Sequence, residues 1–199
     1  MTQDQAQNTL LHQESKTLLS LTNDIVFKLY FTKEENRELL KQFIKAMTHL
    51  TDDDLEEIEI KNSTLTKEHV REKDFIVDIL LTSKRLHIMN IEMQRKGHGG
   101  FLNRIIGYNS REFSSQLSRG QKYTEVKETI SLVIVDFNLL KDSDDFLEHA
   151  FFRRKNDKVF TEAQQFYIID LTKLPQELTH TQHHWGALLN LLYRIVELL

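Results

Sequence analysis

The chain has 199 residues, a length that suits one domain with a small extension, and its 40% hydrophobic content is enough to bury a core. It contains no cysteine, which excludes disulfides and cysteine-based zinc sites and fits a reducing compartment. The net charge of −4 argues against a protein that is coated in basic surface.

The N-terminal segment, residues 1–20, is polar and rich in glutamine, which predicts a loose arm and not a signal peptide. No apolar stretch approaches the roughly 20 residues that a helix needs to cross a bilayer. Together these features predict a soluble, cytoplasmic protein without membrane contact.

Two helices are expected next. A polar cap precedes Asp24, where the first helix is expected to begin. Thr32 and Glu35 have the spacing of a capping box, which predicts a second helix that begins there and runs to about Leu50.

Three runs rich in Ile, Val, Phe and Leu then predict strands at residues 58–65, 74–81 and 86–94. A helix is expected from Phe101 to Arg119, with Gly120 as its stop signal. Later strands are expected at residues 130–137, 148–154 and 165–171, and an apolar helix at residues 184–199. That helix ends without a cap or polar tail, which is typical of a truncated fragment.

Asp78 and Glu92 lie on two adjacent predicted strands, and Glu92 shares its face with Gln94 because side chains alternate along a strand. A three-residue turn at 83–85 would place Asp78 opposite Asn90 and diagonal to Glu92. A register shifted by two would place Asp78 directly opposite Glu92. Either register puts the carboxylates on one face, about 5–8 Å apart, whereas a shift by one would separate them.

Two carboxylates beside apolar neighbours are costly unless a cation joins them. Mg²⁺ accepts such oxygen ligands, and the backbone carbonyl of Met93 offers another. Gln94 would then orient the attacking water or contact the phosphate. The alternative is that Asp78 and Glu92 pair with nearby lysines or arginines, and spacing alone favours that alternative.

A basic zone follows the third strand. Residues 94–127 hold seven basic residues against two acidic ones, which suits either a polyanion or a solvated helix face. Within it, positions 104, 108 and 111 share one side of the predicted helix, where the arginines would contact phosphate or make packing and surface pairs. The candidate DNA contacts are Arg95, Lys96, Arg104, Tyr108 and Arg111.

The order helix, three strands, helix, strand, with Asp on the second strand and Glu-x-Gln on the third, resembles the PD-(D/E)XK nuclease fold. Within that fold the chain resembles the Rpn family of recombination-promoting nucleases, also described as transposases. The similarity covers about residues 20–178. The matching pieces are Asn23–Lys28, Asp74–Ile79, Asn90–Gln94, Arg104, Tyr108, Leu117, Gly120, Tyr123, and Phe166–Leu171 with Lys173 and Pro175.

The resemblance implies an α/β restriction-endonuclease-like core, α-β-β-β-α-β, in which a mixed central sheet is flanked by helices. That core would occupy residues 21–140, and residues 141–199 would extend it with strands and a helix. It implies a DNA endonuclease that uses Mg²⁺, or alternatively Mn²⁺ or Ca²⁺, to hydrolyse phosphodiester bonds in recombination or transposition. A homodimer would suit a double-strand cut.

The resemblance also assigns residues. Asp78 and Glu92 correspond to metal ligands, and Gln94 occupies the position of the motif's lysine. Asp24 matches an acidic position that serves as a further metal or water ligand, although an acid at a helix N-terminus is favoured for that placement alone.

Two other functions stay open. The fold is also compatible with an inactive module that binds DNA or protein, and the acidic net charge and Gln94 both favour that reading. A structural or regulatory partner of a separate transposition enzyme is the third possibility. The histidines at 180, 183 and 184 indicate a loop and helix start and not a zinc site, because no fourth ligand is near in the sequence.

Overall fold

A six-stranded mixed sheet forms the centre of the computed structural model, in the order β1-β4-β5-β6-β8-β7. The structure describes residues 24–61, 64–65, 75–76, 78–83, 88–117 and 120–174. The strands of this sheet are β1 (Glu59–Lys61), β4 (Ile79–Thr82), β5 (Ile88–Gln94), β6 (Thr129–Val135), β7 (Leu147–Arg153) and β8 (Val159–Asp170). The helices are α2 (Asp24–Phe31), α3 (Arg37–Met47) and α4 (Phe101–Ser115), and short 3-10 helices are η1 (Glu34–Asn36), η2 (Tyr123–Glu125) and η3 (Leu171–Lys173).

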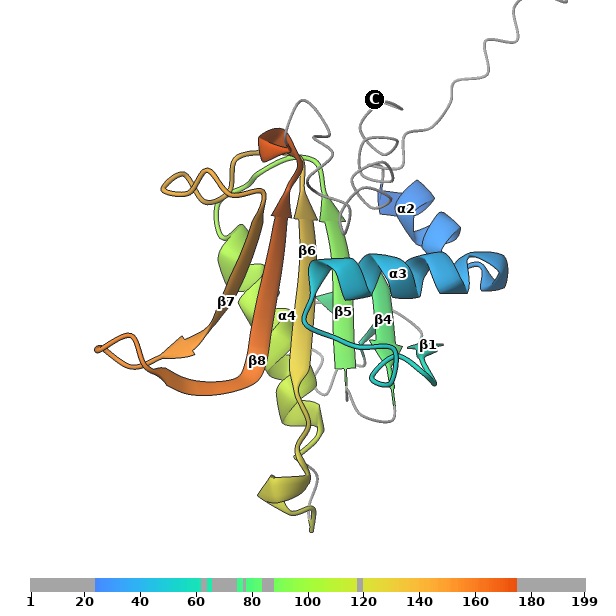
Figure 1. The fold of residues 1–199 in the computed structure, drawn as a ribbon, viewed down its shortest axis with the longest axis vertical. Helices are drawn as coiled ribbons and strands as arrows, with labels where there is room; N and C mark the ends of the chain where they lie inside the picture. Colours follow the sequence, from blue (N-terminus) through green and yellow to red (C-terminus); the bar gives the residue numbers. More distant parts are fainter. Residues whose placement is uncertain are drawn as a thin grey trace, which may run out of the picture.

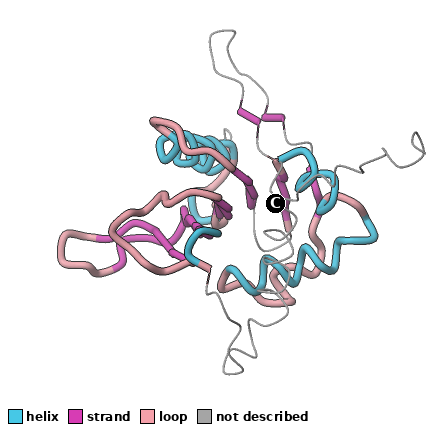
Figure 2. Tube along the Cα trace, turned by 90° about the horizontal axis from the view of Figure 1, so that it is seen from above, coloured by secondary structure: helices cyan, strands magenta, loops and turns pink. Residues whose placement is uncertain are grey.

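Helices cover both faces of the sheet. Helices α2 and α3 lie on one face and α4 on the other, as Figures 1 and 2 show from two directions. The larger core lies under α2 and α3, where Phe27, Phe31 and Phe43 are fully buried. The predicted mixed sheet flanked by helices is therefore confirmed.

The strand directions place the carboxyl ends of three neighbouring strands at the same end of the sheet. Strands β5, β6 and β8 are parallel, and β4 and β7 run antiparallel to their neighbours on either side. In register, Gln94 pairs with Val135, and Val135 pairs with Asp170. In open α/β sheets, ligands commonly bind beyond the carboxyl ends of the parallel strands, so this end is where a site is expected.

The first two predicted strand runs are divided. The run at 58–65 gives β1 and then β2 (Thr64–Leu65), and the run at 74–81 gives β3 (Phe75–Ile76) and then β4. Strands β2 and β3 pair with each other in a separate two-stranded sheet, whereas β1 pairs with β4. An apolar pattern predicts an extended chain but not the strand with which it pairs, so this division was not predictable.

The capping-box prediction was wrong. The hydroxyl of Thr32 donates a hydrogen bond of 2.7 Å to the carbonyl of Lys28, so it satisfies the end of α2. A 3-10 helix then occupies Glu34–Asn36, and α3 begins only at Arg37. Threonine commonly bonds back to the carbonyl four residues earlier, and that use competes with capping.

Helix α4 ends at Ser115, four residues before the predicted end. The side-chain amide of Gln116 accepts a bond from the Lys127 N–H at 2.8 Å and donates one to the Lys127 carbonyl at 3.1 Å. The helix therefore stops where Gln116 joins it to the chain that leads into β6. Gly120 has a φ of +93° and lies in the connection that follows.

Helix α4 is fixed to the sheet by Asn109, which is fully buried. Its amide nitrogen donates to the Thr129 carbonyl at 3.1 Å, the Ser131 hydroxyl at 3.0 Å and the Gln165 carbonyl at 3.3 Å. Its oxygen accepts from Gln164 at 2.9 Å. These bonds set the position of the helix, and hence of every side chain that it directs at the site.

The predicted arm at 1–20, the terminal helix at 184–199 and the three histidines all lie outside the described residues. No helix that the structure describes is long and apolar enough to span a bilayer.

Candidate active site

Asp78 and Glu92 lie opposite each other. Ile79 pairs with Ile91 across the antiparallel strands β4 and β5. Asp78 directly precedes β4, so the same register continues to Glu92. Of the two registers that the sequence left open, the structure has the one that sets these acids face to face.

The carboxylate of Asp78 is anchored to β5, because its Oδ2 accepts a 2.7 Å hydrogen bond from the Met93 N–H. The Gln94 carbonyl accepts a bond from the Asp136 N–H, on the β6 side, at 3.0 Å. Because backbone groups alternate in direction along a strand, the N–H and carbonyl of Met93 face the β4 side. The Met93 carbonyl is thus directed to the side on which Asp78 lies.

Glu92 carries an unusual carboxyl group. Only 7% of the residue is exposed, and its pKa is raised to about 7, mainly by burial and also by the negative charge of Asp78. The positive charge of Arg104 and its hydrogen bond oppose this rise. A buried carboxyl group beside a second acid holds a proton near neutral pH unless a cation compensates it.

The compensating cation in the structure is Arg104, which α4 directs at the end of β5. Its Nη2 donates to the Oε1 of Glu92 and, at 2.8 Å, to the Oε1 of Gln94. Its Nη1 lies 3.3 Å from the Nε2 of His98. The predicted alternative, in which a site carboxylate pairs with an arginine, is therefore realised for Glu92.

Aromatic rings support the guanidinium. It lies 5.0 Å from the ring centre of Phe101 and 5.9 Å from that of Tyr108, within the range of cation–π attraction. Among the described side chains, the Nε of Arg104 is buried without a hydrogen-bond partner. One donor of the fork is thus unused, which suits a group that acquires a further acceptor when a substrate binds.

Gln94 uses both ends of its amide. The Oε1 accepts from Arg104, and the Nε2 donates to the Lys96 carbonyl at 3.0 Å in the turn that follows β5. In this arrangement Gln94 holds the guanidinium, and both polar atoms of its amide are bonded.

The remaining candidates are distributed around this centre. Tyr108 is buried against β4 and β5, where it packs on Leu80 and Ile88. Arg111 lies next to Glu112, which is buried. Burial raises the pKa of Glu112 to about 7, although the positive charge of Arg111 lowers it.

Arg95 and Lys96 are exposed in the turn after β5. Burial raises the pKa of Asp136, whereas Arg95 lowers it. Asp24 is the first residue of α2, and its side chain lies outside the described part of the structure.

Within the described ranges, no three His, Asp or Glu side chains gather into a metal-binding group. The available donors are two carboxylates and the Met93 carbonyl, all hard oxygens of the kind that Mg²⁺ takes together with water and substrate phosphate. The two neighbouring carboxylates repel each other, so together they require two positive charges, and one guanidinium supplies only one. The donor set therefore fits a divalent ion.

His98 was missed by the sequence reasoning. It contacts Arg104 and stacks edge-on with Phe101, at a centroid distance of 5.6 Å. Its place between glycines, shortly after the Glu-x-Gln strand, was the available signal, because the turn that follows a strand lies near the last residues of that strand.

A polar cluster on the α3 side was also missed. The Nδ1 of His49 lies 2.5 Å from the Tyr167 hydroxyl, and the ring of His149 stacks on Tyr167 at 4.2 Å between centroids. The cluster continues through Gln165, whose amide oxygen lies 2.7 Å from the Nε2 of His149. Its members are far apart in sequence, so no spacing could have indicated it.

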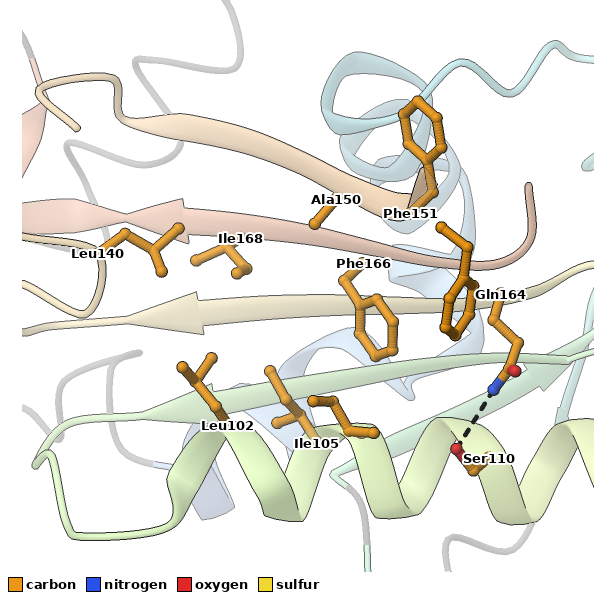
Figure 3. A pocket seen from close by; sticks show the side chains of 11 residues that line it. Leu102, Ile105, Ser110, Leu140, Ala150, Phe151, Gln164, Phe166 and Ile168 are labelled. Carbon is orange, nitrogen blue, oxygen red and sulfur yellow. Dashed lines mark hydrogen bonds between the residues drawn. The ribbon is translucent and has the colours of Figure 1, made fainter. Parts of the chain in front are cut away.

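An apolar groove of about 310 Å³ lies on a different side of α4, between that helix and strands β7 and β8 (Figure 3). Leu102 and Ile105 of α4 face Phe151 and Phe166 across it. Among the described residues that line the groove, none is charged, so these residues do not supply the groups for phosphoryl chemistry.

Comparison of the sequence with protein-family models places the chain in one of them. A family profile described as "PD-(D/E)XK nuclease family transposase" matches residues 21–196. The resemblance inferred from the motifs is therefore confirmed. No curated protein and no solved structure matches the chain.

Proposed function

The chain belongs to the PD-(D/E)XK nuclease family transposases, and on this premise we propose that it is a metal-dependent DNA endonuclease that hydrolyses phosphodiester bonds. The observation that carries the proposal is the β4–β5 register, which continues to set Asp78 opposite the buried Glu92. Nucleases of this type generally use divalent ions, and the acids stand where such an ion would be held.

The carboxylates of Asp78 and Glu92 and the carbonyl of Met93 would hold Mg²⁺, with Mn²⁺ or Ca²⁺ as the alternatives. When bound, such an ion polarises the scissile phosphate and lowers the pKa of a bound water. The bond from the Met93 N–H keeps Asp78 oriented for this role. Asp24 is proposed as a further ligand of the ion or of its water.

Arg104 restores the positive charge that the sequence lacks at Gln94. In the general motif a lysine supplies this cation from the strand, and here a guanidinium arrives from α4 and is held by Gln94. Arginine forms paired bonds to phosphate, which suits it to stabilise charge on the scissile group. Gln94 is then a positioning residue, and Arg104 is the residue that contacts the substrate.

The surrounding cations would follow the DNA backbone. Arg95 and Lys96 are exposed at the same end of the sheet, and Arg111 extends the side of α4 that carries Arg104. Tyr108 lies on that side too, but it is buried, so its part in DNA binding would be to support Arg104 and not to contact the duplex directly. A role in recombination or transposition, a cytoplasmic location, and a homodimer that joins two such centres for a double-strand cut belong to this proposal. So does the division into a core at 21–140 and an extension at 141–199.

Plasmid nicking tests the proposal directly. The wild type is expected to nick supercoiled DNA with Mg²⁺, and Asp78→Asn and Glu92→Gln are expected to lose at least 100-fold in rate. Asparagine retains an oxygen for the Met93 N–H, so the fold is kept. Glu112→Gln is the matched control. It also removes a buried acid with a pKa of about 7, but Glu112 lies outside the site. Cleavage that survives both site variants would contradict the proposal.

A second function is favoured by one observation. Arg104 already occupies the cation position at Glu92, as it would in a nuclease fold kept only for binding DNA or protein. That alternative predicts DNA binding without cleavage in Mg²⁺, Mn²⁺ or Ca²⁺, and equal binding by the wild type and Asp78→Asn.

A further inference from the structure

We propose that the tip of the β7–β8 hairpin is a second DNA-contact surface, which grips the duplex backbone away from the carboxylate site. The tip is defined as residues 152–160, and the proposal rests on the proposed function for its choice of partner. The hairpin projects from the end of the sheet opposite to the carboxyl ends of β5, β6 and β8 (Figure 1).

The tip concentrates positive charge on an acidic protein. Arg153, Arg154, Lys155 and Lys158 are all exposed, and Asp157 is the single acid among them, whereas the whole chain has a net charge of −4. Among the described residues, no ion pair within 4 Å holds any of these four cations. Their charge is therefore available to a polyanion.

Hydrogen bonds within the tip also hold its conformation. Asp157 has a φ of 59°, its N–H bonds to the Arg154 carbonyl at 2.9 Å, and the Arg154 N–H bonds to the Lys158 carbonyl at 2.8 Å. The Arg153 guanidinium donates to the Asp157 carbonyl at 2.9 Å and lies 4.5 Å from the ring centre of Phe151. A surface ordered before binding loses less conformational entropy on contact, so its cations are presented at low cost.

Apolar side chains flank the cations. Phe160 is 72% exposed, and Phe152 and Val159 are each 46% exposed. Exposed aromatic groups beside arginines and lysines are suited to the sugar edges and grooves of a duplex, where phosphates and apolar surface alternate. A purely solvated turn would gain nothing from these exposed rings.

The distance to the carboxylate site suits one turn of DNA. Glu92 pairs with Val133, and Val133 pairs with Ile168 of β8. Ile168 lies ten residues beyond Lys158, and at a rise of about 3.3 Å per residue the separation along β8 is at most about 33 Å. One helical turn of duplex is about 34 Å. A duplex held at Arg104 can thus reach the tip within about one helical turn.

Binding measured without cleavage tests this surface. The full chain is titrated against a fluorescent 24-base-pair duplex in buffer without divalent ions, from 50 to 200 mM salt. The triple variant Arg154→Gln, Lys155→Gln, Lys158→Gln is compared with Lys33→Gln, Lys41→Gln, Lys61→Gln, which removes the same charge near α3 and β1. The hairpin variant is expected to bind about 100-fold more weakly at 150 mM salt, with a log–log salt slope shallower by about 2.7. The α3 and β1 control should stay within about twofold of the wild type, because the distant charges are screened.

A second variant separates apolar contact from charge. Phe160→Ser is expected to weaken binding several-fold and leave the salt slope unchanged. Equal affinity and slope for the two triple variants would overturn the proposal, as would absence of duplex binding by the wild type at 50 mM salt. Loss of binding to phosphatidylserine vesicles with unchanged duplex binding would identify a membrane surface instead, and would also overturn it. Because nicking is measured separately, failure here leaves the proposed activity intact, and a wild type that binds but does not nick leaves this surface intact.

Discussion

Replacing Arg104 by glutamine separates the two roles that its position implies. The guanidinium donates to Glu92 and Gln94, and it compensates a carboxylate that is almost fully buried. If Arg104 holds the place of a cation in the absence of substrate, its removal should strengthen metal binding. If it also contacts phosphate during cleavage, its removal should weaken the reaction.

The magnitude follows from the local electrostatics. Two unit charges about 4 Å apart interact by about 4 kcal/mol at an effective dielectric constant of 20. The Arg104 side chain is 31% exposed, so solvent screening reduces this to roughly 1.5–3 kcal/mol. A competing cation therefore regains about 10- to 100-fold in affinity when the guanidinium is absent. Loss of one positioned donor to the reacting phosphate should lower the cleavage rate by about 100-fold or more.

Mn²⁺ binding is measured by electron paramagnetic resonance at pH 8 without DNA, above the pKa of about 7 that Glu92 has beside Arg104. Because Arg104 lowers that pKa, binding by the variant is also followed at higher pH, where Glu92 is ionised without the guanidinium. The control is Arg111→Gln, which removes the same charge from the same helix without a bond to Glu92 and should change Mn²⁺ affinity by less than about twofold. Unchanged or weaker Mn²⁺ binding in Arg104→Gln would refute the reasoning, even if cleavage is lost. Tighter binding with lower cleavage is the combination that only the double role produces.

Three further predictions concern stability, each measured by urea unfolding. The folded-state pKa of Glu112 lies above its unfolded value, so the protonated side chain contributes stability below about pH 4.5, and this stability is lost as pH rises through about 7. Glu112→Gln should therefore raise the unfolding free energy by up to about 3 kcal/mol at pH 8 and by little at pH 4.5. Asp170 is buried, accepts bonds from Thr172 and lies 3.5 Å from the largely buried amine of Lys173, so Asp170→Ala should lower the unfolding free energy by about 3–5 kcal/mol, against about 1 kcal/mol for Thr172→Ala. Asn109→Ala leaves two buried carbonyls without its amide and should cost about 3 kcal/mol; a loss below about 1 kcal/mol would show that α4 is held by other contacts.

The sequence predicted the parts of the fold that depend on local pattern. Helix α2 occupies Asp24–Phe31 where a helix was expected, and the buried strands β5 and β6 lie close to their predicted bounds, because apolar periodicity is a local property. The start of α3 was mispredicted because of a competing local bond: Thr32 bonds back to Lys28 and does not cap α3. The end of α4 was mispredicted for a non-local reason, because Gln116 bonds to Lys127, eleven residues later, in the segment that leads into β6.

The candidate site was predictable only in its acids. Asp78 and Glu92 stand on strands joined by a short connection, so strand pairing limited them to a few registers, and the structure selects one of these. The position of Arg104 depends on how α4 crosses the sheet, which is set by bonds from Asn109 to β6 and β8. No spacing in the sequence encodes that crossing, so Arg104 was predicted either to contact phosphate or to make packing and surface pairs, and Glu92 was not singled out as its partner.

This difference changes how the substitution of lysine by Gln94 is interpreted. Read along the strand alone, a neutral amide in the motif removes a positive charge and favours an inactive fold. In three dimensions the amide oxygen of Gln94 holds a guanidinium 2.8 Å away, so the charge is retained but comes from α4. A lysine at position 94 would place a second cation beside Arg104, which is unfavourable at short range. Glutamine on β5 and arginine on α4 are therefore best understood as one unit, and a reciprocal change, Gln94→Lys with Arg104→Gln, should retain more cleavage than Arg104→Gln alone if the site needs the charge and not its source.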